Sequence, residues 1–329
     1  MRSDPLPPIP ILLRALRAIL RTLKPNAGSH RISTAPFIRR LTARVADDRV
    51  LTSTPGSFLI EADLDDYNGR KLYLFGTNDW KINRTVNALL FEQDIFLDIG
   101  ANYGTVGFGA IDQVGSAGEV HLFEPQPDLA ERLAAAMDRR GTPNVYLHRL
   151  ALGEVDGELP LVVPTGHSGK GSLAASKSMT GERFMVPVRA AGALVASLTG
   201  PRPFGVKVDA EGADLEIIRS VAPAANCQFI VFEGGADRQE ICQHLMDLGF
   251  AVFGISRSLL SPSVVALGQP ADCMKYHDAA AIRLYDHSAG QAGMVGPGGK
   301  MSLARFRYLA RAQRERAPTG VLPAGETRP

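Results

Sequence analysis

Cysteine is scarce in this sequence, and so is net charge. The three cysteines, Cys227, Cys242 and Cys273, are odd in number and widely spaced. They therefore predict neither a disulfide framework nor a CxxC metal pair. We expect three buried thiols and a reducing, cytoplasmic environment. A formal net charge of only +2 over 329 residues gives the whole molecule no electrostatic reason to bind nucleic acid.

A long apolar segment is absent as well. No run reaches the roughly 18 to 20 apolar residues of a transmembrane helix. The stretch IPILLRALRAILRTLK at 9–24 is amphipathic, and its arginines interrupt the apolar core that a signal peptide would need. Helical spacing separates its cations from its apolar residues, namely Arg14, Arg17, Arg21 and Lys24 from Leu12, Ala15, Ile19 and Leu23. Two interpretations follow: peripheral contact of residues 6–24 with an anionic membrane, or packing on the domain itself or on a partner.

The composition that is present is ordinary for a globular protein, with 45% hydrophobic and 21% charged residues, which is enough for a sizeable core. From residue 95, apolar strands alternate with helices, which predicts a doubly wound, mostly parallel α/β sheet covered on both faces. The expected strands are 95–100, 119–125, 145–153, 204–210, 228–235 and 250–255, with AAIRLY at 280–285 closing a seven-stranded sheet.

Other segments surround this core. FLIEADL and KLYLFG flank Asn68-Gly69, a pair that favours a tight hairpin turn, and 79–92 has a helical pattern. LARFRYLARAQRER at 303–316 is a second basic helix candidate. The chain thus divides into a basic amphipathic extension (1–49), a β-hairpin and helix (50–94), a catalytic domain (95–287) and a Gly-rich, basic, partly disordered tail (288–329).

The stretch FLDIGANYGTVGFGA at 96–110 places an acid and a glycine-rich turn after the first core strand. In a parallel sheet such a turn lies at the ligand-binding edge, where glycines let a ligand approach the backbone. A dinucleotide-binding protein would need GxGxxG, but Asn102 stands in place of the second glycine. Asp98 would repel a pyrophosphate and attract a cation. The alternative is that Asp98 only caps the next helix.

A second acid, Glu124, ends the second core strand. At this position a carboxylate can accept hydrogen bonds from both ribose hydroxyls of a nucleoside. S-adenosylmethionine is a nucleoside that carries positive charge and no phosphate, so it suits both acids. The sequence therefore predicts S-adenosylmethionine as the cofactor.

Charged residues also end the fourth and fifth strands. FGVKVDAEG carries Lys207, Asp209 and Glu211, and IVFEGG carries Glu233. Charges at the end of a buried strand are costly unless they are paired or face a cleft. Because the fourth strand of a doubly wound sheet lies beside the first, we expect this cluster to face the cofactor. The alternatives are a Lys207–Asp209 salt bridge and a helix-start role for Glu211.

Several of these motifs together resemble the FkbM family of methyltransferases. The resemblance rests on FLDIGANYGTVG, FEP, the ALG and DG pairs at 151–157, VKVDAEGADLEII and IVFE, in this order, and covers about 70–255. GKGSL at 169–173 resembles the small-residue loop of that family, whereas 1–49 and 288–329 lie outside the resemblance.

The resemblance implies a Rossmann-like class I methyltransferase fold, S-adenosylmethionine as donor, and O-methylation of a hydroxyl on a sugar or glycan, a lipid-linked saccharide or a polyketide. The residues expected to bind the cofactor are Asp98, Gly100, Ala101, Asn102, Tyr103, Gly104, Glu124, Pro125 and Ala151. The residues expected in catalysis are Asp209, Glu211, Lys207 and Glu233.

We expect alignment of the acceptor oxygen with the methyl group to account for most of the rate enhancement, and a general base to raise the rate about 10²- to 10⁴-fold. Asp209 is the predicted base, with Glu211 or Glu233 substituting for it or positioning the acceptor. His167, in the Gly- and Ser-rich loop 164–182, is the imidazole candidate. Histidine spacing indicates no metal site, although Asp209 with Glu233 could imitate one.

Three other functions are alternatives to methyl transfer to a small acceptor. A nicotinamide oxidoreductase lacks its GxGxxG motif. A binding module without turnover would not need the acids 209, 211 and 233. A nucleic-acid methyltransferase would use the basic ends, where Phe306 and Tyr308 lie between arginines and could stack on bases; the alternative for this segment is a solvated amphipathic helix.

Overall fold

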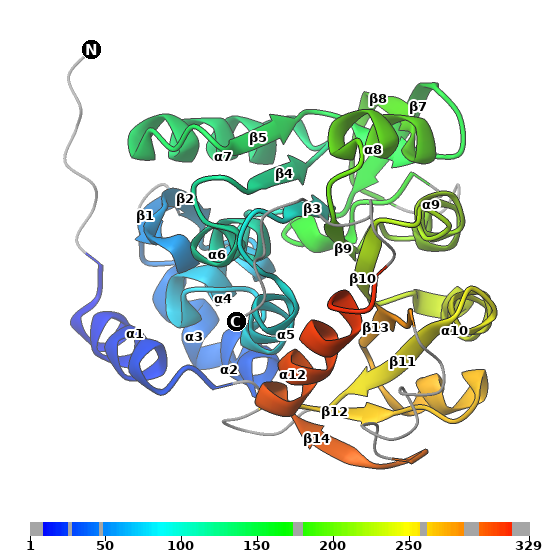
Figure 1. The fold of residues 1–329 in the computed structure, drawn as a ribbon. Coiled ribbons are helices and arrows are strands. Elements are labelled where there is room, and N and C mark those ends of the chain that lie inside the picture. The colour runs from blue at the N-terminus through cyan, green and yellow to red at the C-terminus, as the bar shows by residue number, and fades with distance from the viewer. Residues whose placement is uncertain are drawn as a thin grey trace.

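The computed structural model describes residues 9–25, 28–45, 49–173, 180–256, 262–285 and 296–317. At its centre lies a nine-stranded sheet with the order β14-β12-β11-β13-β10-β9-β3-β4-β5 (Figure 1). The strands are β3 (Ile95–Ile99), β4 (Glu119–Phe123), β5 (Val145–His148), β9 (Phe204–Val208), β10 (Cys227–Phe232), β11 (Phe250–Ile255), β12 (Ser263–Ala266), β13 (Ala279–Arg283) and β14 (Lys300–Ser302).

The direction of the strands confirms a doubly wound, mostly parallel sheet. Only β12 and β13, among the described strands of this sheet, run against the others. The chain leaves β3 toward β4 and β5, then returns to β9 on the other side, so the topological switch point lies between β3 and β9. The expected strand at 280–285 forms as β13, but it inserts between β10 and β11. The expected seven strands are extended to nine because β12 and β14 add to the β11 edge.

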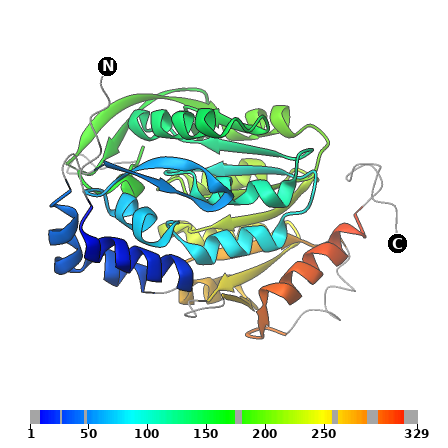
Figure 2. The ribbon, with the colours of Figure 1, turned by 90° about the vertical axis from the view of Figure 1, so that its left-hand side faces the viewer.

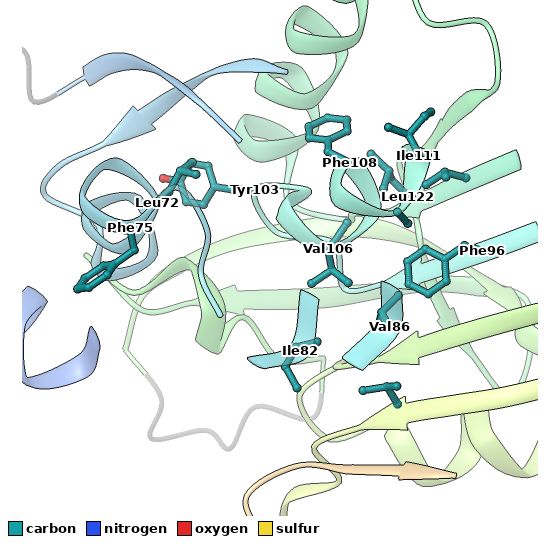
Figure 3. Close-up of a cluster of buried hydrophobic side chains, with 14 of the residues drawn as sticks. Leu72, Phe75, Ile82, Val86, Phe96, Tyr103, Val106, Phe108, Ile111 and Leu122 are labelled. Carbon is teal, nitrogen blue, oxygen red and sulfur yellow. The ribbon is translucent and has the colours of Figure 1, made fainter. Parts of the chain in front are cut away.

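Helices cover both faces of the sheet. One face carries α5 (Trp80–Leu89), α6 (Thr105–Val114), α7 (Pro127–Arg140) and α12 (Leu303–Arg314), and the other carries α8 (Ala191–Thr199), α9 (Asp214–Val221) and α10 (Arg238–Asp247). Alternation along β3 divides the core: Phe96 belongs to the first hydrophobic cluster, and Ile95 and Leu97 to the second. Figure 3 shows the first cluster, where side chains of α5 and α6 meet the sheet, and Leu72 and Phe75 lie on a further helix, α4 (Tyr67–Phe75). The three cysteines are buried free thiols, as expected.

The expected hairpin around Asn68-Gly69 is wrong. KLYLFG lies in helix α4 (Tyr67–Phe75), and the antiparallel pair is formed by β1 (Arg49–Ser53) and β2 (Leu59–Asp63). Asp66 accepts a hydrogen bond from the backbone N–H of Gly69, and Gly76 ends the helix in the left-handed conformation. An N-cap acid and a glycine at the C-terminus are stronger local signals than the turn pair.

The amphipathic N-terminal helix, α1 (Ile11–Leu23), packs on the domain through an unexpected face. Leu13 and Leu20 are buried, and Arg21 donates hydrogen bonds to the backbone carbonyls of Ser53, Leu72 and Tyr73. The inward face therefore includes arginine. Two short helices, α2 (Ser29–Thr34) and α3 (Pro36–Thr42), follow it, and Figure 2 shows all three along one edge of the molecule.

The described part of the C-terminal segment, 296–317, is built into the core. β14 pairs with β12, and α12 packs on α5. Phe306, expected as a base-stacking residue, is fully buried against Phe253. Arg314 forms a buried ion pair with Asp94 at 2.6 Å. This segment is therefore a structural support of the sheet, and the nucleic-acid interpretation loses one of its two aromatic residues.

A second sheet of three strands lies beside the main one, in the order β6-β8-β7. Its strands are β6 (Ala151–Gly153), β7 (Gly157–Val163) and β8 (Glu182–Ala190). The segment 145–153, expected as one strand, divides between the two sheets. No helix in the described ranges is long and apolar enough to span a bilayer.

Candidate active site at the switch point

A cavity of about 420 Å³ opens at the carboxyl ends of β3, β4, β9 and β10. Of the residues expected to bind the cofactor, those that line it are Gly100, Ala101, Asn102, Glu124, Pro125 and Ala151. All four expected catalytic residues, Lys207, Asp209, Glu211 and Glu233, also line it. Asp98, Tyr103 and Gly104 are not part of its wall. The volume is in the range of small-molecule sites.

The glycine turn needs its glycine at position 100. Gly100 has φ +72°, and a Cβ there would lie 2.0 Å from the backbone oxygen of Asp209. Only glycine therefore lets the turn after β3 touch the turn after β9. Asn102 also has positive φ, at 51°, a conformation that asparagine tolerates better than most residues.

Asp98 lies beneath this turn. Its side chain is fully buried, and its Oδ2 accepts a hydrogen bond from the backbone N–H of Gly107 in the first turn of α6 at 2.8 Å. Lys207 Nζ lies 3.3 Å from its Oδ1. The position of Asp98 therefore matches the alternative role of a helix cap. Its hydrogen bond fixes the glycine turn from the buried side.

Lys207 joins the two turns. Burial alone would lower its pKa, but the carboxylates of Asp98 and Asp209 raise the pKa of Lys207 overall. Its ammonium donates a hydrogen bond to the carbonyl of Gly100 at 2.7 Å and lies 3.5 Å from Asp209 Oδ2. Lys207 and Asp209 therefore form the salt bridge that was the alternative expectation. Lys207 also holds the glycine turn in place through its hydrogen bond to Gly100.

Glu124 holds the opposite side of the turn. Its two carboxylate oxygens accept hydrogen bonds from the backbone N–H groups of Asn102 and Gln126, at 2.7 and 2.9 Å. Burial raises the pKa of Glu124 to about 7. A buried carboxylate has further lone pairs for hydroxyl donors, so Glu124 can both fix the turn and bind a ribose.

The acids at the ends of β9 and β10 form one cluster. Burial and neighbouring Asp209 raise the pKa of Glu211 and of Glu233 to about 7. Glu211 has φ +41°, and its carbonyl accepts a hydrogen bond from Ser172. Raised carboxyl pKa values in a cleft are typical of catalytic sites.

Sequence reasoning missed a histidine in this cluster. His277 precedes β13, and its ring nitrogens lie 3.3 Å from Glu233 Oε1 and 3.3 Å from Asp278 Oδ1. Asp278 is buried and forms an ion pair with Lys81 of α5. Although burial would raise it, contacts with His277 and Lys81 lower the pKa of Asp278 to about 2. These residues meet only through the insertion of β13 beside β10, which local sequence does not reveal.

The same three side chains bring possible metal ligands within 4.8 Å of one another: Glu233, His277 and Asp278. The ammonium of Lys81 already neutralises Asp278 from inside. A metal cation would lie beside that ammonium, and like charges at short range repel. The arrangement therefore suits proton transfer better than metal binding.

The Gly- and Ser-rich loop covers the glycine turn, as far as residues 164–173 are described. Ser168 donates from its backbone N–H and its hydroxyl to Asp66, at 2.7 and 2.9 Å, and accepts from Asn102. Gln126 donates to its carbonyl. His167 lies in the cavity wall and stacks on Tyr67. This part of the loop is thus tied to three elements around the cavity.

The residues fit S-adenosylmethionine. Asn78 lines the cavity, and its buried Oδ1 has no hydrogen-bond partner among the described residues, while its Nδ2 donates to Asn102. A free acceptor beside the glycine turn suits an ammonium or hydroxyl donor. The acids at the strand ends favour a cationic ligand.

Comparisons with known proteins agree with this geometry. Residues 98–252 match the family model described as the methyltransferase FkbM domain. Hexuronic acid methyltransferase AglP from Haloferax volcanii is 28% identical over 160 residues, which are 47% of this chain and 63% of AglP. The chain thus spans less than two thirds of that curated relative.

Two solved structures give weaker likenesses. Methyltransferase FkbM from Methylobacillus flagellatus has 13% identity and a TM-score of 0.38, with 78% of this chain and 60% of that chain covered. Fibrillarin from Aeropyrum pernix, crystallised with natively bound S-adenosylmethionine, has 16% identity and a TM-score of 0.33, with coverages of 62% and 77%.

The sheet order, its switch point and the acid-flanked glycine turn define a class I methyltransferase fold. Within that class, residues 98–252 match the FkbM methyltransferase domain, and S-adenosylmethionine is the cofactor that this match indicates. The expected fold, family and cofactor are thereby confirmed.

Proposed function

We propose that the protein transfers a methyl group from S-adenosylmethionine to a hydroxyl of a sugar or glycan. The observation that carries the proposal is the meeting of the glycine turn and the acid cluster in one cavity. The relative AglP is named for a sugar acid, which supports a saccharide acceptor over a polyketide.

S-adenosylmethionine, when bound, supplies a methyl group on a sulfonium leaving group. Glu124, Asn102 and Asn78 would hold the cofactor, and the acid cluster would align the acceptor oxygen with the methyl carbon. A carboxylate oxygen of the cluster would accept the hydroxyl proton as the acceptor oxygen takes the methyl group from the sulfonium, which would leave as the neutral thioether. Orientation of this kind can contribute roughly 7 to 11 kcal/mol.

Of the expected bases, Glu233 has support that Asp209 lacks. Asp209 is paired with Lys207, and an adjacent cation weakens a carboxylate as a base. Burial raises the pKa of Glu233 to about 7, and His277 lies beside it. We assign proton acceptance to Glu233, and to Asp209 the positioning of the acceptor hydroxyl.

Calorimetric titration with S-adenosylhomocysteine tests the cofactor site, with NADH as a control. Micromolar affinity for the first ligand alone is expected. Preferential binding of NADH would contradict the assignment and favour an oxidoreductase. Transfer of labelled methyl groups to a panel of sugars and lipid-linked saccharides then tests the acceptor class, and methylation of polyketide hydroxyls alone would contradict it.

We further propose that α1 contacts an anionic membrane, which would bring a lipid-linked acceptor to the enzyme. Its outer face exposes Ile11, Leu12, Ile19 and Leu23, each by more than half of its surface. The sequence from 9 to 45 contains eight Lys and Arg residues and no Asp or Glu. An apolar helical face within a purely basic segment matches an interface of anionic lipids.

Co-sedimentation with vesicles containing phosphatidylglycerol tests this contact. The double substitution Ile19→Ser and Leu23→Ser should release the protein to the supernatant, and Met185→Ser, at an exposed apolar position on β8, should not. Equal binding by all forms, or sedimentation that does not depend on anionic lipid, would rule out the proposed contact.

A further inference from the structure

Lys71 of α4 lines the cavity and has no carboxylate partner among the described residues. Its ammonium lies 5.3 Å from the centre of the Tyr67 ring. Burial lowers the pKa of Lys71. A half-buried ammonium in a ligand cavity is costly unless a ligand supplies a counter-charge.

The acids near Lys71 already have other cationic partners. Asp278 and Asp79 pair with Lys81, and Asp209 pairs with Lys207. Among the described residues of the cavity wall, Lys71 and Lys170 are therefore the lysines without a carboxylate partner, and Lys71 is the half-buried one.

A second group beside Lys71 also lacks a partner. His167 stacks on the Tyr67 ring with centroids 4.7 Å apart, and its buried Nδ1 makes no hydrogen bond within the described ranges. His30 Nδ1 and the Tyr67 hydroxyl lie 3.1 Å apart on the same wall. Lys170, three residues after His167, also lines the cavity. This wall is basic, whereas the acids gather at the ends of the strands.

The origin of these residues indicates which ligand they meet. Lys71 and Tyr67 belong to α4, and His30 to α2, all before the FkbM match that begins at residue 98. The glycine turn and Glu124 lie inside that match. Apart from the loop residues His167 and Lys170, which lie inside the match, this wall comes from outside the shared domain. It is therefore suited to the acceptor, which differs between enzymes, rather than to the common cofactor.

We propose that Lys71 and His167 bind an anionic group of the methyl acceptor, a carboxylate or phosphate carried by the sugar. The inference rests on the proposed sugar O-methylation and narrows its substrate to an acidic saccharide. The lysine supplies a point charge, and the imidazole supplies a directional N–H donor.

The test is calorimetric or NMR titration of the protein saturated with S-adenosylhomocysteine. The probes are D-glucuronate, D-glucose 6-phosphate and neutral D-glucose. We expect at least one anionic sugar to bind about tenfold or more tightly than glucose, with the preference weakening as salt is added. The better of the two anions identifies carboxylate or phosphate. Equal binding of all three sugars, or no binding of any, would overturn the inference.

Variants locate the site. Lys71→Met should abolish the preference for the anion, Lys71→Arg should keep much of it, and Lys300→Met, at an exposed position on β14, should leave it unchanged. Loss of S-adenosylhomocysteine affinity in Lys71→Met would instead assign the lysine to the cofactor and overturn the inference. If that variant does not fold, the wild-type comparison still decides. Failure of the wild type to bind S-adenosylhomocysteine would refute the proposed function itself, which separates the two failures.

Discussion

At the scale of single residues, Glu124 is expected to link cofactor binding to pH. Its carboxylate fixes Asn102 and Gln126 and faces the cavity. Glu124→Gln replaces an ionised acceptor by a neutral amide, so affinity for S-adenosylhomocysteine should fall about 10- to 100-fold at pH 8. Because burial raises the pKa of Glu124 to about 7, wild-type affinity should also weaken below pH 7. An affinity independent of both the substitution and pH would remove Glu124 from the ribose site.

The same residue has a consequence for stability. A carboxyl whose pKa is raised from 4.5 to about 7 on folding stabilises the fold fully below pH 4.5. That contribution, up to about 3 kcal/mol, is lost as pH rises through 7. Glu124→Gln should therefore flatten the fall in unfolding free energy between pH 5 and 8, measured by urea denaturation. Part of the pH dependence of the unfolding free energy should remain in this variant, because the pKa values of Glu211 and Glu233 are raised too.

Glu233→Gln tests the base. Turnover on an accepted sugar should fall about 10²- to 10⁴-fold while affinity for S-adenosylhomocysteine is retained. The wild-type rate should rise with pH through about 7, where Glu233 ionises, and this inflection should vanish in the variant. Asp209→Asn should chiefly raise KM. A variant with the wild-type rate and pH profile would exclude Glu233 as the base.

At the scale of elements, α1 is anchored by Arg21. This side chain donates to Thr52 and Ser53 of β1 and to the carbonyls of Leu72 and Tyr73 in α4. Arg21→Met should lower the unfolding free energy by about 2 to 4 kcal/mol, because several buried acceptors lose their donor. Arg14→Met, at an exposed position of the same helix, is the matched control and should change little. Equal stability of both variants would show that the helix is held by its leucines alone.

Local sequence predicted most core elements but failed where two signals competed. The apolar strands at 95–99 and 204–208 were predictable because burial on both faces leaves a continuous apolar run. At 67–75, Asn68-Gly69 suggested a turn, yet capping by Asp66 and packing of the apolar residues on the core favoured a helix. The strand pairs β12–β14 and β7–β8 depend on tertiary partners, so short-range patterns do not specify them.

At the scale of the whole molecule, α12 supports the sheet from a distance in sequence. Phe306 is fully buried, whereas Tyr308 on the same helix is 74% exposed. Phe306→Ala should cost about 3 to 5 kcal/mol of unfolding free energy, and Tyr308→Ala should cost less than about 0.5. Thermal or urea denaturation measures both. Similar small effects would mean that the C-terminal helix is not part of the cooperative core.

The sequence predicted only part of the site. The glycine turn and the acids 124, 209, 211 and 233 follow strands directly, and parallel topology brings strand ends together. Lys71, Lys81 and His277 come from helices and loops on other sides of the cavity, and Lys81 meets Asp278 across 197 residues. Their meeting depends on the whole fold, so no spacing in the sequence indicates it.

The bare Cα of Gly100 against the carbonyl of Asp209 has a consequence for binding. The turn proposed to hold the cofactor and the turn proposed to present the acceptor acid are in contact, so occupancy of one should favour the competent state of the other. Thermodynamic reciprocity requires that S-adenosylhomocysteine tighten sugar binding by the same factor by which the sugar tightens S-adenosylhomocysteine binding. A pair of titrations, each ligand with and without the other, therefore measures the coupling between the two turns.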